Sequence, residues 1–248
     1  MPYRFYAPEA STSGRLVSLS PAEGDHLARV LRLGVGETVR VFDGKGNEFE
    51  ALVSTVDRAG VTLQLSNPVE TAPEPRVHLT LAQAVLKARK FETVVRDATM
   101  LGAAVIQPIL TSRTERSAPA TRLVQRAVKR WCSISIASAK QCGRAVIPVI
   151  KAPMTLHDLV EKSTSERRIF LVEPRNDVKP ENLQTLACQP LPVNATVAIG
   201  PEGGWSDSEV VLAETGGFDL LTLGVRTMRA DAVPIAALAV LEFIWGDL

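Results

Sequence analysis

The sequence has few residues that could hold a metal ion. Its 248 residues include three cysteines and three histidines, with no Cys-x-x-Cys pair and no Cys/His spacing of a zinc site. An odd, scattered set of cysteines is typical of proteins from reducing compartments. We therefore expect no bound metal and a reduced, cytoplasmic setting.

Long apolar segments are also missing. Residues 1–11 contain no apolar stretch of the kind that marks a secretory signal. The longest apolar run, 232–244, includes Pro234 and Glu242 and is too short to cross a bilayer. We interpret this run as a buried helix and expect no membrane partner.

Two common nucleotide-binding motifs are absent, namely Gly-x-x-x-x-Gly-Lys-Ser/Thr and Gly-x-Gly-x-x-Gly. Instead, a first glycine loop (200–204, GPEGG) and a second loop (223–229, LGVRTMR) each follow a predicted strand. Loops at the carboxyl ends of strands hold the ligand in open α/β sheets. Glu202 and the lack of Lys or Arg in the first glycine loop favour a hydroxyl-rich or cationic ligand, such as S-adenosylmethionine. The alternative is that Gly203-Gly204 only closes a tight turn.

Acidic residues are missing from one long segment. None occurs between Arg116 and Lys151, and residues 76–151 carry 14 Lys and Arg against 3 Asp and Glu, in a chain of net charge +1. This asymmetry predicts contact with a polyanion, although pairing between basic and acidic faces would also explain it. One face of the predicted helix 121–142 repeats basic side chains at helical spacing: Arg122, Arg126, Lys129 and Arg130.

The pattern of apolar residues divides the chain in two. Residues 1–70 read as a small, partly closed β-barrel, with strands at 16–19, 38–42, 48–53 and 61–65 and one short helix at 21–31. The Pro-rich segment 71–76 is predicted to be a linker. From residue 77, strands (77–84, 105–110, 146–150, 169–172, 196–199, 220–223) alternate with helices (90–101, 121–142, 156–161, 180–186, 207–214, 233–245). This alternation predicts an α/β fold with a parallel sheet.

Two helices carry further information. Ser206 and Glu209 form the Ser-x-x-Glu capping box, which fixes a helix start directly behind the first glycine loop. The last helix, 233–245, is apolar on nearly every side, so it must be enclosed by the sheet and other helices or must pack against a second copy.

Taken together, these segments resemble a known family. IGPEGGWSDSE and LGVRTMRADAVPIAALAVLE are similar to motifs of the SPOUT class of RNA methyltransferases, and most closely to the 16S ribosomal RNA uridine-N3 methyltransferases of the RsmE type. Segments 26–51, 87–115 and 130–144 share the resemblance, so it covers nearly the whole chain. The chain departs from the family pattern at four positions: Ala88 in place of Gly, Val225 of Pro, Ala230 of Thr and Asp231 of Glu.

The resemblance implies a fold and a function. It implies a PUA-like RNA-binding domain over residues 1–70 and a SPOUT methyltransferase domain with a trefoil knot over 77–248, with the active site at a homodimer interface. The implied reaction is S-adenosylmethionine-dependent methylation of uridine N3 in the 16S ribosomal RNA of the small ribosomal subunit. The rival functions are a non-catalytic RNA-binding or ribosome-assembly protein and a nucleotide-dependent oxidoreductase, of which the missing phosphate motifs disfavour the second.

Site residues follow from the loops and from the basic stripe. Arg229 is predicted to stabilise charge on the pyrimidine, and Asp231 to orient Arg229 or accept a proton, unless the two form only a structural pair. The predicted cofactor residues are Leu171, Val172, Glu173, Ile199, Gly200, Pro201, Glu202, Gly203, Gly204, Leu223, Gly224, Val225, Arg226 and Met228. The predicted RNA contacts are Arg4, Arg29, Arg32, Arg113, Arg116, Arg122, Arg126, Lys129, Arg130 and Arg144.

Overall fold

The chain forms two units in the computed structural model, which describes residues 2–114, 121–174 and 183–246, apart from the side chains of 121–123, 183 and 184. The first unit comprises Met1–Glu74 and Ile136–Ile147, and the second comprises Pro75–Ser135 and Pro148–Leu248. The segment Ile136–Ile147 was expected in the second domain. It belongs to the first unit because the last two turns of a long helix pack there.

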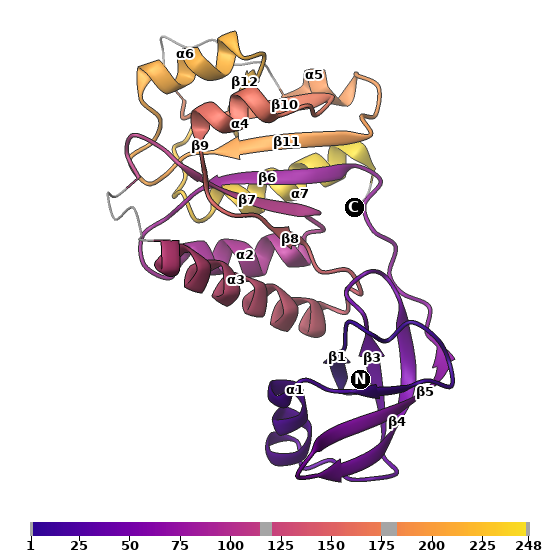
Figure 1. The fold of residues 1–248 in the computed structure, drawn as a ribbon. Coiled ribbons are helices and arrows are strands. Elements are labelled where there is room, and N and C mark those ends of the chain that lie inside the picture. Colours follow the sequence, from indigo (N-terminus) through magenta and orange to yellow (C-terminus); the bar gives the residue numbers. More distant parts are fainter. Residues whose placement is uncertain (1, 115–120, 175–182, 247–248) are drawn as a thin grey trace. The chain divides into compact units, whose positions relative to one another are not determined.

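A curled five-stranded sheet makes up most of the first unit (Figure 1). Its strands run in the order β1-β3-β4-β5-β2, and all neighbours are antiparallel except β1 and β3. Alternate residues point inward and form one core, which includes Val39, Val41 and Leu63. The strands are β1 (Arg4–Tyr6), β2 (Leu16–Ser18), β3 (Thr38–Phe42), β4 (Glu48–Asp57) and β5 (Gly60–Pro68).

The predicted hairpin and short helix are both present in this unit. Between β3 and β4 the Asp43 carboxylate accepts hydrogen bonds from the backbone N–H groups of Lys45 and Asn47, which closes the turn. The helix begins at Pro21 with Ser20 as its N-cap, but it divides into α1 (Pro21–Asp25) and the π-helical turn η1 (His26–Val30). The sequence predicted one continuous α-helix, and β1 was not predicted because three residues give no readable alternation.

Arg4 fastens the end of helix α3 (Thr121–Cys142) within the first unit. Its guanidinium donates to the carbonyl oxygens of Ala139 (2.6 Å) and Lys140 (3.2 Å) and forms a 2.7 Å ion pair with Glu48. The side chains of Arg4 and Glu48 are only 10% and 4% exposed. The carbonyl groups at a helix C-terminus lack intrahelical donors, so the cation satisfies them.

Two of the predicted RNA contacts therefore have structural roles. Arg4 is largely buried and bonded to protein groups, and the Arg144 side chain, 7% exposed, pairs with Glu74. Neither guanidinium is presented to a phosphate, so we correct the assignment of both residues. Sequence spacing could not reveal this, because their partners lie 44 to 140 residues away.

The second unit is built on a parallel sheet of seven strands, as the alternation predicted. The order is β12-β10-β11-β6-β7-β8, with β9 also paired to β7 (Figure 1). The strands are β6 (His78–Ala84), β7 (Val105–Leu110), β8 (Val149–Ile150), β9 (Met154–Thr155), β10 (Arg167–Leu171), β11 (Asn194–Ile199) and β12 (Asp219–Leu221). Its helices besides α3 are α2 (Lys90–Met100), α4 (Leu156–Lys162), α5 (Leu183–Ala187), α6 (Asp207–Thr215) and α7 (Val233–Trp245).

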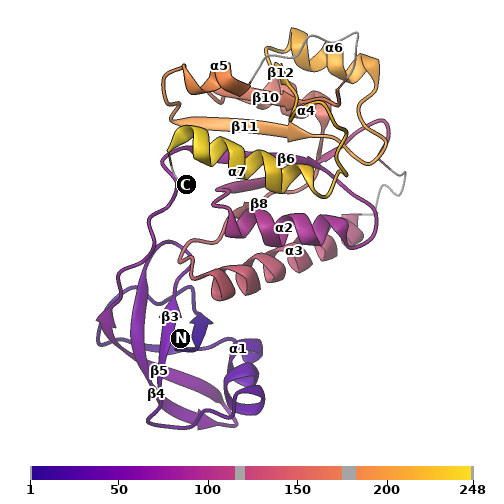
Figure 2. The ribbon, with the colours of Figure 1, turned by 180° about the vertical axis from the view of Figure 1, so that it is seen from behind.

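Helices cover both faces of this sheet. Leu81, Ile169 and Val197 pack with α2 and α7 on one face, where Figure 2 shows α7 in front of β6 and nearly along it. Residues one position along, such as Phe170 and Ala198, pack with α4 and α6 on the other face. Because successive strand residues point to opposite faces, the apolar runs of β6, β10 and β11 supply both cores.

The surface of α7 is only partly covered by the chain itself. Pro234, Ala237, Leu238 and Leu241 are buried, but Ile235 is 39% and Phe243 72% exposed. These two lie eight residues apart on one side of the helix. Among the described residues, then, the sheet and helices enclose one side of α7 and leave an apolar strip on the other.

The fastening of α3 gives a stability test. Replacing Arg4 with Met leaves the buried Glu48 carboxylate without its cation, so we expect the free energy of unfolding to fall by about 3 to 5 kcal/mol. The matched control is Arg29→Met, because Arg29 is 81% exposed in its pair with Asp25 and should contribute under about 1 kcal/mol. Urea unfolding followed by circular dichroism measures both; equal losses would contradict the structural role of Arg4.

Candidate functional site

A cavity of about 320 Å³ opens where β10, β11 and β12 end. It is walled by the segment after β10, by the first glycine loop and by the second loop with the residues that follow it. All predicted cofactor residues line it except Gly203, Gly224 and Val225. Leu171, Ile199, Leu223, Met228 and Val233 supply apolar surface, and six charged side chains lie among them: Lys90, Glu173, Glu202, Arg226, Arg229 and Asp231.

The three exceptions lie outside the cavity for identifiable reasons. Gly203 faces Arg113, whose guanidinium donates to the Gly203 carbonyl oxygen at 2.8 Å and whose stem would lie 3.3 Å from a Cβ added at Gly203. Gly224 is exposed, with φ of 82° and open space around it, and Val225 is 85% exposed. The second loop therefore turns outward at its tip and returns to the cavity with Arg226 and Met228.

In the first glycine loop, the backbone at Gly204 favours glycine over any other residue. The residue has φ of +67°, and a Cβ there would lie 2.9 Å from a carboxylate oxygen of Glu173. This left-handed backbone favours glycine, and any other side chain would also displace the Glu173 carboxylate. Gly200 likewise lies against the indole of Trp205, so the loop approaches the cavity through its backbone.

Trp205 joins the first glycine loop to the neighbouring strand. Its indole N–H donates to the carbonyl oxygen of Leu171 at 2.8 Å, and its ring stacks on Phe170 with 4.2 Å between centroids. A buried aromatic ring with a satisfied N–H is a rigid support. The walls contributed by β10 and β11 are thus fixed to one another.

The predicted capping box is confirmed, and its carboxylate reaches further than expected. Glu209 accepts hydrogen bonds from the backbone N–H of Ser206 (2.9 Å) and from that of Ser112 (2.7 Å), in the segment after β7. Burial by itself opposes ionisation of Glu209, but the hydrogen bonds from Ser206 and Ser112 outweigh it and lower the pKa of the carboxyl. One carboxylate therefore holds two loops at the carboxyl edge of the sheet.

Glu202 is not the unpaired carboxylate that the sequence suggested. Its Oε1 accepts from the Lys90 ammonium at 3.0 Å and from the backbone N–H of Lys87 at 3.2 Å. Partial burial opposes ionisation, but these hydrogen bonds outweigh it and lower the pKa of Glu202. A cation from α2 therefore lies beside the first glycine loop, so the lack of Lys or Arg within the loop does not by itself favour a cationic ligand.

Arg229 and Asp231 form a two-point ion pair at the cavity. Arg229 Nε donates to Oδ1 at 3.1 Å and Nη2 to Oδ2 at 2.9 Å, while the Arg229 side chain stays 75% exposed. The hydrogen bonds from Arg229 are the main cause of a lowered pKa at Asp231. The geometry fixes the plane of the guanidinium, and it makes Asp231 a weak proton acceptor.

The predicted RNA contacts divide into several groups. Arg126 and Lys129 are exposed on α3. Arg130 forms a 2.7 Å ion pair with Glu92, so its charge is neutralised by a carboxylate on another helix, α2. In the first unit, Arg29 and Arg32 are exposed, and Arg32 has a positive φ of 58°. Arg116 and the side chain of Arg122 lie outside the described residues.

Sequence reasoning missed several residues that line the cavity. Lys90, Trp205, Thr222 and Thr227 were not assigned to it. The sequence analysis used Lys90 only as the start of a helix. A signal for its role was available, because Lys90 follows β6, and β6 ends at the same edge of the sheet as the strands that form the cavity. Within the described ranges no group of three His, Cys, Asp or Glu residues is placed to hold a metal, and no helix is long and apolar enough to cross a membrane.

The fold and the cavity together define an α/β domain with a small-molecule site at its sheet edge, joined to a small β-sheet domain. The RNA methyltransferase domain family matches residues 73–242, and an RNA methyltransferase PUA domain matches 19–66. The chain therefore belongs to the RNA methyltransferase family.

Named relatives and solved structures agree with this membership. Ribosomal RNA small subunit methyltransferase E of Synechocystis sp. is 35% identical over 96% of this chain and 77% of its own. The enzyme of that name from Aquifex aeolicus is 29% identical over 96% of this chain and 97% of its own. A putative methyltransferase of Legionella pneumophila, solved with bound SAM, superposes with a TM-score of 0.89 at 31% identity, covering 98% of both chains.

Glu209 gives a pH-dependent test of the loop support. The pKa of Glu209 is lower in the folded protein than in the unfolded chain, where it is about 4.3. The ionised carboxylate therefore contributes its full stabilisation of the fold at pH values above about 4.3, and this contribution is lost as the pH falls through the pKa of the folded protein. We expect Glu209→Gln to lower the free energy of unfolding at pH 7 by about 2 kcal/mol. Thermal melts from pH 7 to pH 3 should show the difference from wild type narrowing below about pH 4.

The control is Glu214→Gln, an exposed carboxylate on the same helix. It should change the unfolding free energy by less than about 0.5 kcal/mol at any pH. A Glu209→Gln deficit that stayed constant down to pH 3 would show that lost packing, and not the charge, causes it.

Proposed function

We propose that this protein uses S-adenosylmethionine to methylate N3 of a uridine in the 16S ribosomal RNA of the small ribosomal subunit. One observation carries the proposal: two glycine-containing loops, which follow different strands, line one cavity at the carboxyl edge of a parallel sheet, together with the guanidinium of Arg229. The RNA methyltransferase family and the relatives' names support the substrate class.

The cavity suits S-adenosylmethionine on several counts. It combines apolar walls with the carboxylate of Glu173, with that of Glu202, which is paired with Lys90, and with the backbone of Gly200 and Gly204. Carboxylates and backbone groups match ribose hydroxyls, the adenine edge and a sulfonium centre. When bound, this cofactor supplies an electrophilic methyl group. The solved relative from Neisseria gonorrhoeae, 27% identical with a TM-score of 0.85 over 99% of this chain and 98% of its own, contains S-adenosylmethionine.

The chain's own residues would act mainly by positioning and by electrostatics. Neutral uridine is a poor nucleophile at N3, so the N3 proton must leave and charge must develop on the flanking oxygens. Arg229 would stabilise that charge, and Asp231 would hold the guanidinium plane. Because the pKa of Asp231 is lowered, we assign it to orientation and leave the proton to solvent.

RNA would be gathered by exposed cations, and a second copy would complete the assembly. Arg113, Arg126 and Lys129 are exposed in the second unit, and Arg29 and Arg32 in the first. The exposed strip of Ile235 and Phe243 on α7 supports a homodimer, and a sedimentation mass of a single chain would contradict it.

With ribosomal RNA as substrate, we place the protein in the cytoplasm. The trefoil knot stays a prediction.

The decisive experiment incubates the purified protein with labelled S-adenosylmethionine and small ribosomal subunits and then maps the modified nucleotide. Label in 16S RNA at uridine N3 supports the proposal. RNA binding without methyl transfer, and without stabilisation by S-adenosylmethionine, would instead favour an assembly protein. Stabilisation by NAD in place of S-adenosylmethionine would favour an oxidoreductase.

Arg229 tests the chemistry of the site. Replacing it with Ala removes the cation from the developing charge, and we expect kcat to fall about 100- to 1000-fold. The dissociation constant of S-adenosylmethionine, measured by calorimetry, should stay within about threefold if most of its contacts come from elsewhere in the cavity. Arg229→Lys should recover only part of the rate, because it keeps the charge and loses the two-point pairing. Unchanged turnover in Arg229→Ala would dispose of the assignment.

The basic stripe of α3 is tested by salt dependence. Each phosphate contact releases counterions, so the logarithm of the RNA association constant falls linearly with the logarithm of the salt concentration. Arg126→Ala and Lys129→Ala should each make this fall less steep, reducing the magnitude of the slope by about 1. Filter binding of 16S RNA over a salt series measures the slope. Lys162→Ala is the matched control, because Lys162 is an exposed lysine on α4, where it pairs with Asp158. Equal slopes for all three variants would contradict an RNA contact on α3.

A further inference from the structure

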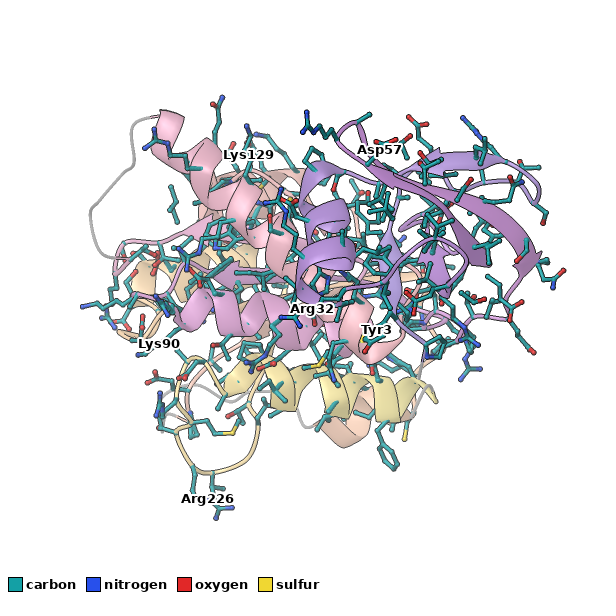
Figure 3. The ribbon with its side chains drawn as sticks, turned by 90° about the horizontal axis from the view of Figure 1, so that it is seen from below. Tyr3, Arg32, Asp57, Lys90, Lys129 and Arg226 are labelled. Carbon is teal, nitrogen blue, oxygen red and sulfur yellow. The ribbon has the colours of Figure 1, made fainter. Side chains whose placement is uncertain are left out.

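We propose that Lys90 is a second catalytic cation, whose ammonium contacts an oxygen of the pyrimidine as N3 loses its proton. The inference rests on the uridine-N3 reaction proposed above. Removing the N3 proton spreads negative charge over both flanking carbonyl oxygens, so one guanidinium leaves the second oxygen without a cation. Lys90 lines the same cavity as Arg229 and comes from a different element, the start of α2 (Figure 3).

The position of the ammonium is fixed by its surroundings. Lys90 Nζ lies 3.0 Å from Glu202 Oε1, and that carboxylate is held in turn by the backbone N–H of Lys87. The Lys90 side chain is 38% exposed, whereas that of Arg229 is 75% exposed. Its charge is also felt at Asp231, where it adds to the lowering of the pKa. The lysine is therefore tied to the first glycine loop and lines the same cavity as the Arg229–Asp231 pair.

The remaining charged groups of the cavity do not offer the same role. Arg226 is exposed on the second loop (Figure 3), and among the described residues no carboxylate holds its guanidinium as Asp231 holds that of Arg229. Glu173 and Glu202 are anions and would oppose negative charge on the base. A partly shielded ammonium beside apolar walls such as Ile199 and Met228 acts through a lower effective dielectric than a solvated one.

A purely structural reading of the Lys90–Glu202 pair predicts something different. In that reading the pair only ties α2 to the first glycine loop, a contribution of about 0 to 1 kcal/mol for a partly exposed pair. Loss of either partner would then have the same effect, on loop position and on cofactor binding. A catalytic ammonium instead makes the two partners unequal, because Lys90 alone faces the developing charge.

The reaction balances without a further reagent. N3 gives its proton to solvent, and the N3 electron pair forms the new N–C bond. The methyl carbon–sulfur bond breaks with its electrons returning to sulfur, so the sulfonium becomes a neutral thioether. Lys90 keeps its protons throughout, since its role is to stabilise the charge on oxygen.

The test compares Lys90→Met and Lys90→Gln with wild type on small subunits reconstituted with 16S RNA made from either uridine or 5-fluorouridine. Fluorine withdraws electrons and makes N3 ionise more readily, so it relieves a defect in charge stabilisation. On uridine RNA we expect kcat to fall about 100-fold in both variants, with S-adenosylmethionine affinity by calorimetry within about threefold of wild type. On 5-fluorouridine RNA the deficit should shrink at least tenfold.

Glu202→Gln is the matched comparison, because it breaks the same ion pair and keeps the ammonium. Any deficit it shows should be equal on the two RNAs. Lys90 variants with wild-type kcat, a deficit equal on both RNAs, or loss of S-adenosylmethionine binding in both variants would each overturn the role of Lys90. Failure of the wild-type protein to methylate N3 on the uridine RNA would instead overturn the proposed function itself.

Discussion

The common carboxyl edge of the parallel sheet is the constraint on which the site depends. In a parallel sheet every strand ends at the same edge, so segments far apart in sequence must meet there. The ends of β10, β11 and β12 are three neighbours in the sheet, and the loops that leave them enclose the cavity. Trp205, bonded to the Leu171 carbonyl, and Glu209, bonded to Ser112 and Ser206, then convert proximity into fixed geometry.

Local signals made most of this fold predictable. The bounds of α3 and α7, the Ser206 capping box and the parallel sheet follow from periodicity and from residues a few positions apart. The roles of Arg4 and Arg144 could not be predicted, because exposure and charge partner are set by tertiary contacts, and a buried arginine looks the same in sequence as one facing solvent. The same limit hid Glu92 as the partner of Arg130.

For the candidate site, the sequence identified the loops better than the charges. The glycine-containing loops located much of the cavity lining, because glycine is favoured at turns with positive φ, as at Gly204. The prediction that Glu202 is unpaired was wrong because its partner, Lys90, is 112 residues away in sequence and is brought to the cavity by the segment that follows β6. The cavity contains two ion pairs, Lys90–Glu202 and Arg229–Asp231, so it presents directed dipoles and not the single negative charge that the loop alone suggested.

The departures from the family pattern can be weighed in the same terms. Val225 is 85% exposed at a loop tip outside the cavity, so a missing proline there changes backbone freedom and leaves the cavity walls untouched. Ala88 is different, because it adopts φ of 51° where the family usually has glycine, at a cost of about 1 to 2 kcal/mol. It stands between Lys87, whose N–H donates to Glu202, and the start of α2 at Lys90. A strained residue persists where its surroundings hold it, and here the contacts of Glu202 with both lysines do so. The backbone bend at Ala88 thus lies between the two lysines that hold the Glu202 carboxylate.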